Sequence, residues 1–139
     1  MQRPPERLPD WPERLFDTIQ RHQASPFAWG VCDCGTLFAE SVVAVTGCDP
    51  REGSTWTSRL GALRFLKTRS VPDMLTFVAE RFDEIVPADA RRGDVGFAVV
   101  RGSLTCPAII TGAEAVSRDD DGWIVMPRAL IVRAFKVGR

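Results

Sequence analysis

The sequence contains no long apolar run, no net charge and almost no histidine. Apolar runs such as residues 42–45 and 108–110 are far shorter than the roughly 20 residues of a membrane-spanning helix, so we expect no membrane span. The 18 basic residues equal the 18 acidic residues, and this balance provides no general attraction to nucleic acid. His22 is the single histidine, which limits every mechanism that needs an imidazole. Residues 1–7 lack the apolar stretch of a signal peptide, and we therefore expect synthesis in the cytoplasm.

The length and composition suit one globular domain. The chain has 139 residues, of which 45% are hydrophobic, and this is enough for an apolar core. Residues 1–9 are rich in proline and charge and predict an extended N-terminal arm that could bind a neighbouring subunit, while residues 10–139 form the single domain. Cysteines in a chain without an export signal indicate free thiols, catalysis or a metal site rather than a disulfide framework. The four are Cys32, Cys34, Cys48 and Cys106.

We predict an α+β fold in which N-terminal helices pack on a small antiparallel sheet, because helical patterns precede short β-prone runs. Helices are expected from a cap at Asp10 to about Gln23, from a cap at Asp33 to Thr46, over residues 58–68 and from about Pro72. The last of these should bury Leu75, Val78, Ala79 and Phe82. Strands are expected over residues 95–100, 108–111, 115–117, 123–126 and 131–137. The acidic residues 119–121, followed by Gly122, predict a solvated hairpin turn rather than a calcium site.

The segment before the second helix contains the most informative residue, Cys34. A glycine-containing loop enters the helix here, and the first turn holds the cysteine. The N-terminus of a helix carries about half a positive charge, which stabilises a thiolate and lowers the pKa of a cysteine. This placement predicts a reactive thiol. Hydrolysis would also need a base, usually histidine, and a polar residue that orients the base.

Two segments of the chain form a recognisable pattern. Trp29 and Gly30 are followed by Asp-Cys-Gly-Thr-Leu at residues 33–37, and residues 91–97 contain a Gly-Asp motif ahead of an expected strand. The first segment resembles the Trp-Gly…Asp-Cys-Ser-Gly-Leu signature of the NlpC-type cysteine peptidases, papain-like enzymes that cut cell-wall peptides, and the second resembles the stretch that opens the sheet in that family. Along nearly all of its length the chain is most similar to a phage and prophage branch, typically encoded beside tail genes. The resemblance implies a papain-like fold with Cys34 as the nucleophile. The supporting residues that it implies are Trp29, Gly30, Asp33 and Asp94.

The sequence departs from the enzymes of that family at the position of the base. Active members open the strand after the Gly-Asp motif with a histidine, whereas this chain has Cys106 there, so the resemblance places Cys34 and Cys106 opposite each other. A thiol cannot accept and return protons as an imidazole does near neutral pH. The polar residue that orients the base has no counterpart among Ala115, Val116 and Ser117. The helical spacing of His22 predicts a buried structural histidine, satisfied by a backbone carbonyl, rather than a substitute base.

These features favour a catalytically degenerate peptidase fold that serves as a structural or assembly component of a phage-type or gene-transfer-agent tail, at the tail tip. The expected partners are other tail proteins (hub, distal tail or fibre components), peptidoglycan is a further candidate, and no cofactor is expected. The resemblance implies a protein made in the bacterial cytoplasm and assembled into a virion or virion-like tail. The alternative is an active cysteine peptidase or amidase that cleaves peptidoglycan peptides with Cys34 as nucleophile. A third interpretation is a thiol module, in which Cys32, Cys34 and Cys106 bind zinc or iron or in which Cys34 and Cys106 form a disulfide.

Overall fold

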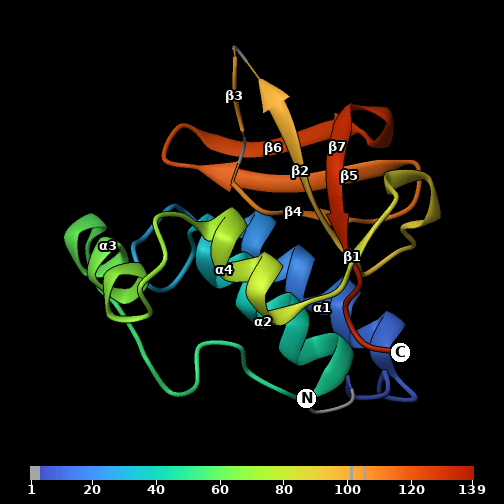
Figure 1. Ribbon diagram of the computed structural model, residues 1–139, viewed down its shortest axis with the longest axis horizontal. Coiled ribbons are helices and arrows are strands. Elements are labelled where there is room, and N and C mark those ends of the chain that lie inside the picture. The colour runs from blue at the N-terminus through green and yellow to red at the C-terminus, as the bar shows by residue number, and fades with distance from the viewer. Residues whose placement is uncertain (1–3, 101, 105) are drawn as a thin grey trace.

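Helices precede nearly all of the strands along the chain, which confirms the predicted α+β class (Figure 1). The computed structural model describes residues 4–100, 102–104 and 106–139. Its helices are α1 (Trp11–Ala24), α2 (Cys34–Thr46), α3 (Arg59–Thr68) and α4 (Met74–Arg81). In Figure 1, α1, α2 and α4 lie together beneath the strands, while α3 lies at one side of this helical layer.

The strands form one antiparallel sheet in the order β1-β7-β2-β4-β5-β6, and β3 pairs with β2 outside this path. Their bounds are β1 (Glu84–Ile85), β2 (Val95–Val100), β3 (Ser103–Leu104), β4 (Ala108–Ile110), β5 (Glu114–Asp119), β6 (Gly122–Pro127) and β7 (Ile131–Phe135). The two-residue strands β1 and β3 have no periodic pattern and were not expected. The other five lie where the sequence predicts them.

Helix α2 is the central element of the core because nearly all of its residues are buried. Its side chains Leu37, Phe38 and Val45 are at most 1% exposed. They belong to one apolar cluster with Phe97 of β2 and Phe135 of β7, which face the helices from the sheet. This cluster fixes the N-terminus of α2 against the sheet.

The opposite face of the sheet buries smaller side chains. Alternate strand residues such as Ala98, Ile110 and Ala134 form a second apolar cluster that also includes Ala90. Two short 3-10 helices, η1 (Pro87–Asp89) and η2 (Arg128–Leu130), are joined at this face because Arg128 donates hydrogen bonds to backbone carbonyls of the η1 segment. Central positions of the sheet, such as residues 97 and 98 of β2 and 109 and 110 of β4, are therefore buried on both faces.

The helix boundaries follow their capping residues, with one exception. Helix α2 follows its N-cap Asp33 and ends at Gly47, whose φ of 77° is the left-handed conformation that favours glycine. Ser58 and Asp73 cap α3 and α4 through their side chains. The predicted cap at Asp10 is wrong. Its φ of −103° and ψ of 23° are not the extended conformation of an N-cap, and its side chain makes no capping hydrogen bond.

The prediction for helix α4 is wrong at one residue. Val78 is buried, and Leu75 and Phe82 pack against the core as expected. Ala79 is exposed, however, and Phe77 is buried instead. The Phe77 ring packs on Phe65 of α3 with a centroid distance of 5.3 Å. The large aromatic side chain takes the inward position, which leaves the small alanine at the surface.

The described part of the N-terminal arm, residues 4–9, lies against its own domain; residues 1–3 of the predicted arm lie outside the described residues. The backbone N–H of Leu8 donates to the Val45 carbonyl oxygen at 2.8 Å. The Arg7 guanidinium forms an ion pair with Asp94 at 2.9 Å and donates to the Val137 carbonyl oxygen at 3.0 Å. Arg7 and Leu8 are thus engaged within the chain and are not free to bind a neighbouring subunit.

Candidate functional site

The loop before α2 is built around the buried carboxylate of Asp33, which is 2% exposed. Its Oδ1 accepts the backbone N–H of Thr36 at 2.8 Å, and the Thr36 hydroxyl accepts the backbone N–H of Asp33 in return, so the two residues form a capping box. Its Oδ2 accepts the backbone N–H of Gly30 and the indole N–H of Trp56, each at 2.7 Å. One side chain therefore holds the helix start, the preceding loop and the connection to α3.

Gly30 is required at its position for two reasons. Its φ of 79° is left-handed, and a Cβ atom there would lie 1.6 Å from the carbonyl oxygen of Trp56. Trp29, the other residue of the Trp-Gly pair, is half-buried against the core and meets the Phe27 ring edge-on at 5.1 Å. The structure gives both residues a role in shaping the loop. Trp56 was missed because it belongs to no motif, and its one sequence signal is an isolated aromatic residue between two helices.

The structure brings the thiols of Cys34 and Cys106 together, as the resemblance predicts. Cys34 is the first residue of α2, and Cys106 lies just before β4. The two side chains share a hydrogen bond. Cys34 is partly buried, whereas Cys106 is exposed to solvent.

The shared hydrogen bond separates the acidities of the two thiols. Together with burial and the negative charges of Cys106 and Asp33, it raises the pKa of Cys34. The same hydrogen bond lowers the pKa of Cys106 and outweighs burial and the carboxylates of Asp119 and Asp33. The two thiols therefore titrate as a pair, and the exposed Cys106 is the member better placed to carry the negative charge because solvent reaches it.

The expected lowering of the Cys34 pKa by the helix N-terminus is wrong. The backbone N–H of Cys34 does act in that direction, but it is the weakest of the influences on this thiol. The hydrogen bond with Cys106 and the loss of solvent act in the opposite direction and are stronger. The neighbour across the site, rather than the helix, determines the protonation state of Cys34.

Asp119 is a site residue that the sequence analysis missed. Pairing of β4 with β5 aligns Ile109 with Val116, and continuing this register places Cys106 opposite Asp119. The negative charge of Asp119 acts on Cys106 accordingly. Ser117, the polar residue among the expected positions 115–117, instead donates to the Pro107 carbonyl oxygen at 3.0 Å. Asp119 is the last residue of β5, the strand after the one that Cys106 precedes, and this acidic strand end is the sequence signal for it.

Cys32 points away from the other two thiols of the predicted cluster. Its Sγ donates to the His22 carbonyl oxygen at 3.3 Å and accepts from Arg118 Nη1 at 2.7 Å. Arg118 is 4% exposed and also donates to the carbonyl oxygens of His22 and Ser25, at 3.0 and 2.9 Å. This buried guanidinium fastens the loop before α2 to β5, and no sequence motif indicates it.

His22 is buried, as predicted, at 1% exposure. Its Nε2 hydrogen-bonds with Glu40 of α2 at 2.6 Å, so its partner is a carboxylate and not the expected backbone carbonyl. Burial opposes the ionisation of Glu40, but the hydrogen bond and charge of His22, together with Arg21, lower the pKa of Glu40 overall. The imidazole therefore joins α1 to α2 and is committed to Glu40 rather than to either thiol of the Cys34 and Cys106 pair.

Asp94, the remaining residue of the implied set, joins three segments of backbone. It is 1% exposed and accepts hydrogen bonds from Arg7, from the backbone N–H of Arg91 and from the backbone N–H of Val137, each at 2.9 Å. These bonds anchor the N-terminal arm and the C-terminal segment at the start of β2. Asp94 supports the sheet on which the site lies.

An apolar cavity of about 160 Å³ adjoins Cys34. Its walls include Trp29, Trp56, Phe65 and Met74, and Arg59 also lines it. A single small apolar side chain matches this volume and lining. The cavity lies between the start of α2 and helix α3.

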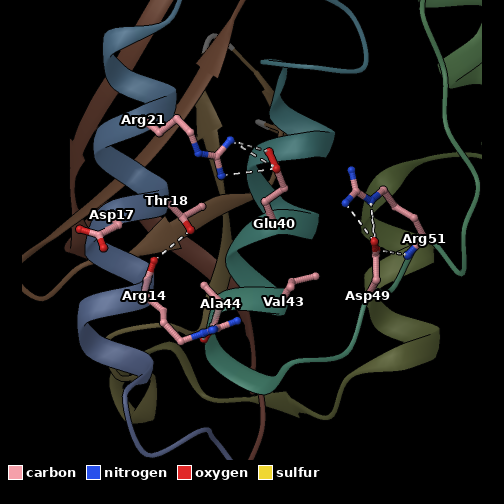
Figure 2. Close-up of a pocket in the computed structure, with 9 residues that line it drawn as sticks. All are labelled: Arg14, Asp17, Thr18, Arg21, Glu40, Val43, Ala44, Asp49 and Arg51. Carbon is pink, nitrogen blue, oxygen red and sulfur yellow. Dashed lines mark hydrogen bonds and ion pairs between the residues drawn. The ribbon is translucent and has the colours of Figure 1, made fainter.

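A second pocket, of about 410 Å³, lies between α1 and the loop after α2 (Figure 2). Charged residues line it, but their guanidinium groups are already bonded within the chain. Arg14 donates to the Ala44 carbonyl oxygen, Arg21 pairs with Glu40, and Arg51 pairs with Asp49, as the dashed lines show for the last two. The paired charges give this pocket a structural role.

The third interpretation, a zinc or iron site of Cys32, Cys34 and Cys106, has no support in the geometry, because the structure does not bring these three thiols into one group. Among the described residues, the one group of three ligating side chains close enough to share an ion is Asp119, Asp120 and Asp121. The Asp119 carboxylate accepts the backbone N–H groups of Asp121 and Gly122, which is the expected hairpin turn. Cys32 is diverted from the thiol pair by its bonds to His22 and Arg118.

The fold and site define an α+β protein in which the first residue of the central helix pairs with a cysteine from the sheet. The chain belongs to the family described as "Domain of unknown function (DUF6950)", which matches residues 6–137. No curated protein and no solved structure matches the chain. In the part of the chain that the structure describes, no helix combines the length and apolar character needed to cross a membrane.

Proposed function

We propose that this protein has a papain-like, NlpC-type fold that has lost its catalytic base, and that it is a structural or assembly component of a phage-type tail, at the tail tip. The observation that carries the proposal is the partner of Cys34. At the position of the nucleophile, the thiol meets a second thiol where an active peptidase needs an imidazole.

The chemistry of the pair supports loss of hydrolysis. A cysteine nucleophile must be a thiolate when it attacks a carbonyl group, and the raised pKa keeps Cys34 protonated near neutral pH. The lowered pKa makes Cys106 the anionic partner, and an exposed thiolate is a poor acid for protonating a leaving amine. Neither thiol performs the role of the missing base.

Exposed apolar side chains near the site support contact with other proteins. Val31, in the loop before Cys34, is 67% exposed, and Leu60 and Leu63 of α3 are 57% and 50% exposed. Leu63 also lines the apolar cavity beside Cys34. A tail protein that covered these residues would bury apolar surface and close the former catalytic cleft.

Complementation of a particle-producing strain tests the structural role. Deletion of the gene should give particles without complete tails, and the wild-type gene should restore them. The Cys34→Ala gene should restore them equally, because assembly does not use the thiol as a nucleophile. Cys48→Ala is the matched control, since Cys48 is an exposed cysteine outside the site. Mass spectrometry of purified tails should detect the chain.

Two results would contradict the proposal. Complete tails from the deletion strain would exclude a structural role. Failure of Cys34→Ala alone, with normal folding and with success of Cys48→Ala, would show that the thiol is needed chemically. That second result would favour the active enzyme.

An active cysteine peptidase or amidase is the second candidate, and the cavity beside Cys34 is the observation that favours it. Cys34 lies at a helix N-terminus next to a pocket able to hold a substrate side chain. Release of peptides from peptidoglycan by the purified wild-type protein, but not by Cys34→Ala, would establish this activity.

Replacing Cys106 by histidine tests whether Cys106 occupies the position of the base. In Cys106→His an imidazole would face Cys34 and accept its proton, so alkylation of Cys34 at pH 7 should accelerate by about tenfold or more. Cys48→His is the control and should leave the rate at Cys34 unchanged. An unchanged Cys34 rate in a folded Cys106→His protein would show that the two positions are not arranged as nucleophile and base.

A further inference from the structure

We propose that Cys106 and Cys34 form a thiol–disulfide exchange site that reacts with small, positively charged disulfides. Cys106 is the attacking residue and Cys34 is the resolving residue. The sequence leaves open whether the two cysteines form a disulfide; the structure adds the order of events and the class of reactant. The proposal does not depend on the tail role, because it concerns the chemistry of the pair alone.

The geometry assigns the two roles. Cys106 is exposed just before β4, so an external disulfide can reach it, whereas Cys34 is partly buried at the start of α2. The thiols already share a hydrogen bond, and a disulfide needs them to approach to about 2 Å. Cys106 therefore makes the first attack because solvent and an external disulfide reach its sulfur, and the lowering of its pKa acts in the same direction. The proton retained by Cys34 keeps that thiol out of the first step.

The exchange balances in two steps. In the first, the Cys106 thiolate attacks one sulfur of a disulfide RSSR, the S–S bond breaks, and RS⁻ leaves and takes a proton from solvent. In the second, Cys34 releases its proton to solvent and its sulfur attacks Cys106 in the mixed disulfide, which expels the second RS⁻. Two protein thiols are oxidised to one disulfide, and RSSR is reduced to two RSH.

The charge around Cys106 selects the reactant. The charged groups that act on this thiol, Asp119 and Asp33, are both negative. Asp120 and Asp121 continue the acidic hairpin, and the three hairpin carboxylates lie within 4.8 Å of one another. This field attracts a cationic disulfide and repels an anionic one, and salt should weaken both effects.

Three disulfides of different charge test the proposal on the reduced, full-length protein: cystamine (cationic), 2-hydroxyethyl disulfide (neutral) and oxidised glutathione (anionic). The reaction is quenched with acid, free thiols are alkylated, and peptides are assigned by mass spectrometry. The expected product is a Cys34–Cys106 disulfide. At low salt cystamine should react about tenfold faster than oxidised glutathione, and the ratio should approach one in high salt.

Variants separate the steps and control for folding. Cys34→Ser should accumulate the mixed disulfide at Cys106, because the resolving thiol is absent. A double variant, Asp120→Asn with Asp121→Asn, changes two exposed side chains and should reduce the preference for cystamine while keeping the internal disulfide. Cys48 provides an exposed reference thiol in every sample and should retain a mixed disulfide. Circular dichroism confirms that each variant is folded.

Three outcomes would overturn the proposal. Persistent mixed disulfides at Cys106 in the wild-type protein would show that Cys34 does not resolve them. Equal rates with cystamine and oxidised glutathione at low salt would show that charge does not select the reactant. A mixed disulfide at Cys34 in place of Cys106 would reverse the assigned roles. None of these results affects the complementation test of the tail role.

Discussion

Replacement of Asp33 by alanine should destabilise the protein far more than loss of an ordinary helix cap. The variant removes the cap bond from Thr36, which contributes about 1 kcal/mol at a typical N-cap. It also removes two bonds to a buried carboxylate, from Gly30 and from the Trp56 indole, at 2.7 Å each. Hydrogen bonds to charged groups contribute about 1.5–3 kcal/mol each. With the lower value for both, the free energy of unfolding should fall by about 4 kcal/mol.

Asp73→Ala is the matched control for this prediction. Asp73 also caps a helix, with its Oδ1 accepting the backbone N–H of Thr76 at 2.8 Å, but this bond is exposed. Removal of this bond should lower the free energy of unfolding by about 1 kcal/mol. Asp33→Asn adds a third comparison, because asparagine caps a helix well but turns an amide NH₂ toward the donors of Gly30 and Trp56. We expect the loss of unfolding free energy in Asp33→Asn to lie between the losses in the two alanine variants.

Urea unfolding, followed by tryptophan fluorescence, measures these differences in the free energy of unfolding, and thermal unfolding followed by circular dichroism measures the melting temperatures. For a chain of this size, about 3 °C of melting temperature corresponds to 1 kcal/mol, so Asp33→Ala should lower the melting temperature by about 12 °C and Asp73→Ala by about 3 °C. Equal losses for the two variants would refute the reasoning, because they would show that the bonds from Gly30 and Trp56 add nothing to the cap.

Three further predictions concern the contacts that hold the site in place. Arg7→Ala should lower the free energy of unfolding by about 3 kcal/mol, since it leaves the buried Asp94 carboxylate without its cation, and limited proteolysis should then cleave the arm. Arg118→Met should lower the free energy of unfolding by only about 1–2 kcal/mol, because the loss of its hydrogen bonds is partly offset by the removal of a buried charge. Urea unfolding measures this loss, and faster amide exchange should be confined to the loop before α2. Glu40 has a pKa below its unfolded value, so its stabilising effect is present above about pH 4.3 and is lost as the pH falls through the folded pKa. Glu40→Gln should therefore flatten the decline of stability in acid, and an unchanged acid titration of unfolding would contradict this.

The sequence predicts most of the architecture because local signals and packing agree. Asp33 and Gly47 mark both ends of α2, and the burial of Leu37 and Val45 follows from helical spacing. The arm was harder to predict, because its attachment depends on Arg7 reaching Asp94 across 87 residues of sequence. No local pattern indicates a contact of that kind.

The sequence predicts the two thiols of the site but neither their supporting residues nor the electrostatics. The resemblance to NlpC-type peptidases placed Cys34 and Cys106 together, and the structure brings them together. Trp56 and Arg118 were missed because each acts through one long-range contact to the loop before α2. The shift in the pKa of Cys34 was predicted in the wrong direction. A sequence indicates the N-terminus of a helix, but it does not indicate how a partner thiol is protonated.

Cys106 decides which chemistry this site supports. Two features that would present Cys34 as a nucleophile are in place: the helix N-terminus and the rigid turn at Gly30, both held by hydrogen bonds to Asp33. With an imidazole opposite, they would favour a thiolate on Cys34 paired with a cation. With a thiol opposite, the negative charge moves to the exposed side of the pair, where it faces the carboxylate of Asp119. The same scaffold then favours attack on an external sulfur at Cys106 over attack on a carbonyl group at Cys34. A measured order of reactivity with Cys106 ahead of Cys34 in the wild-type protein, together with faster alkylation of Cys34 in Cys106→His, would follow from the identity of this single residue.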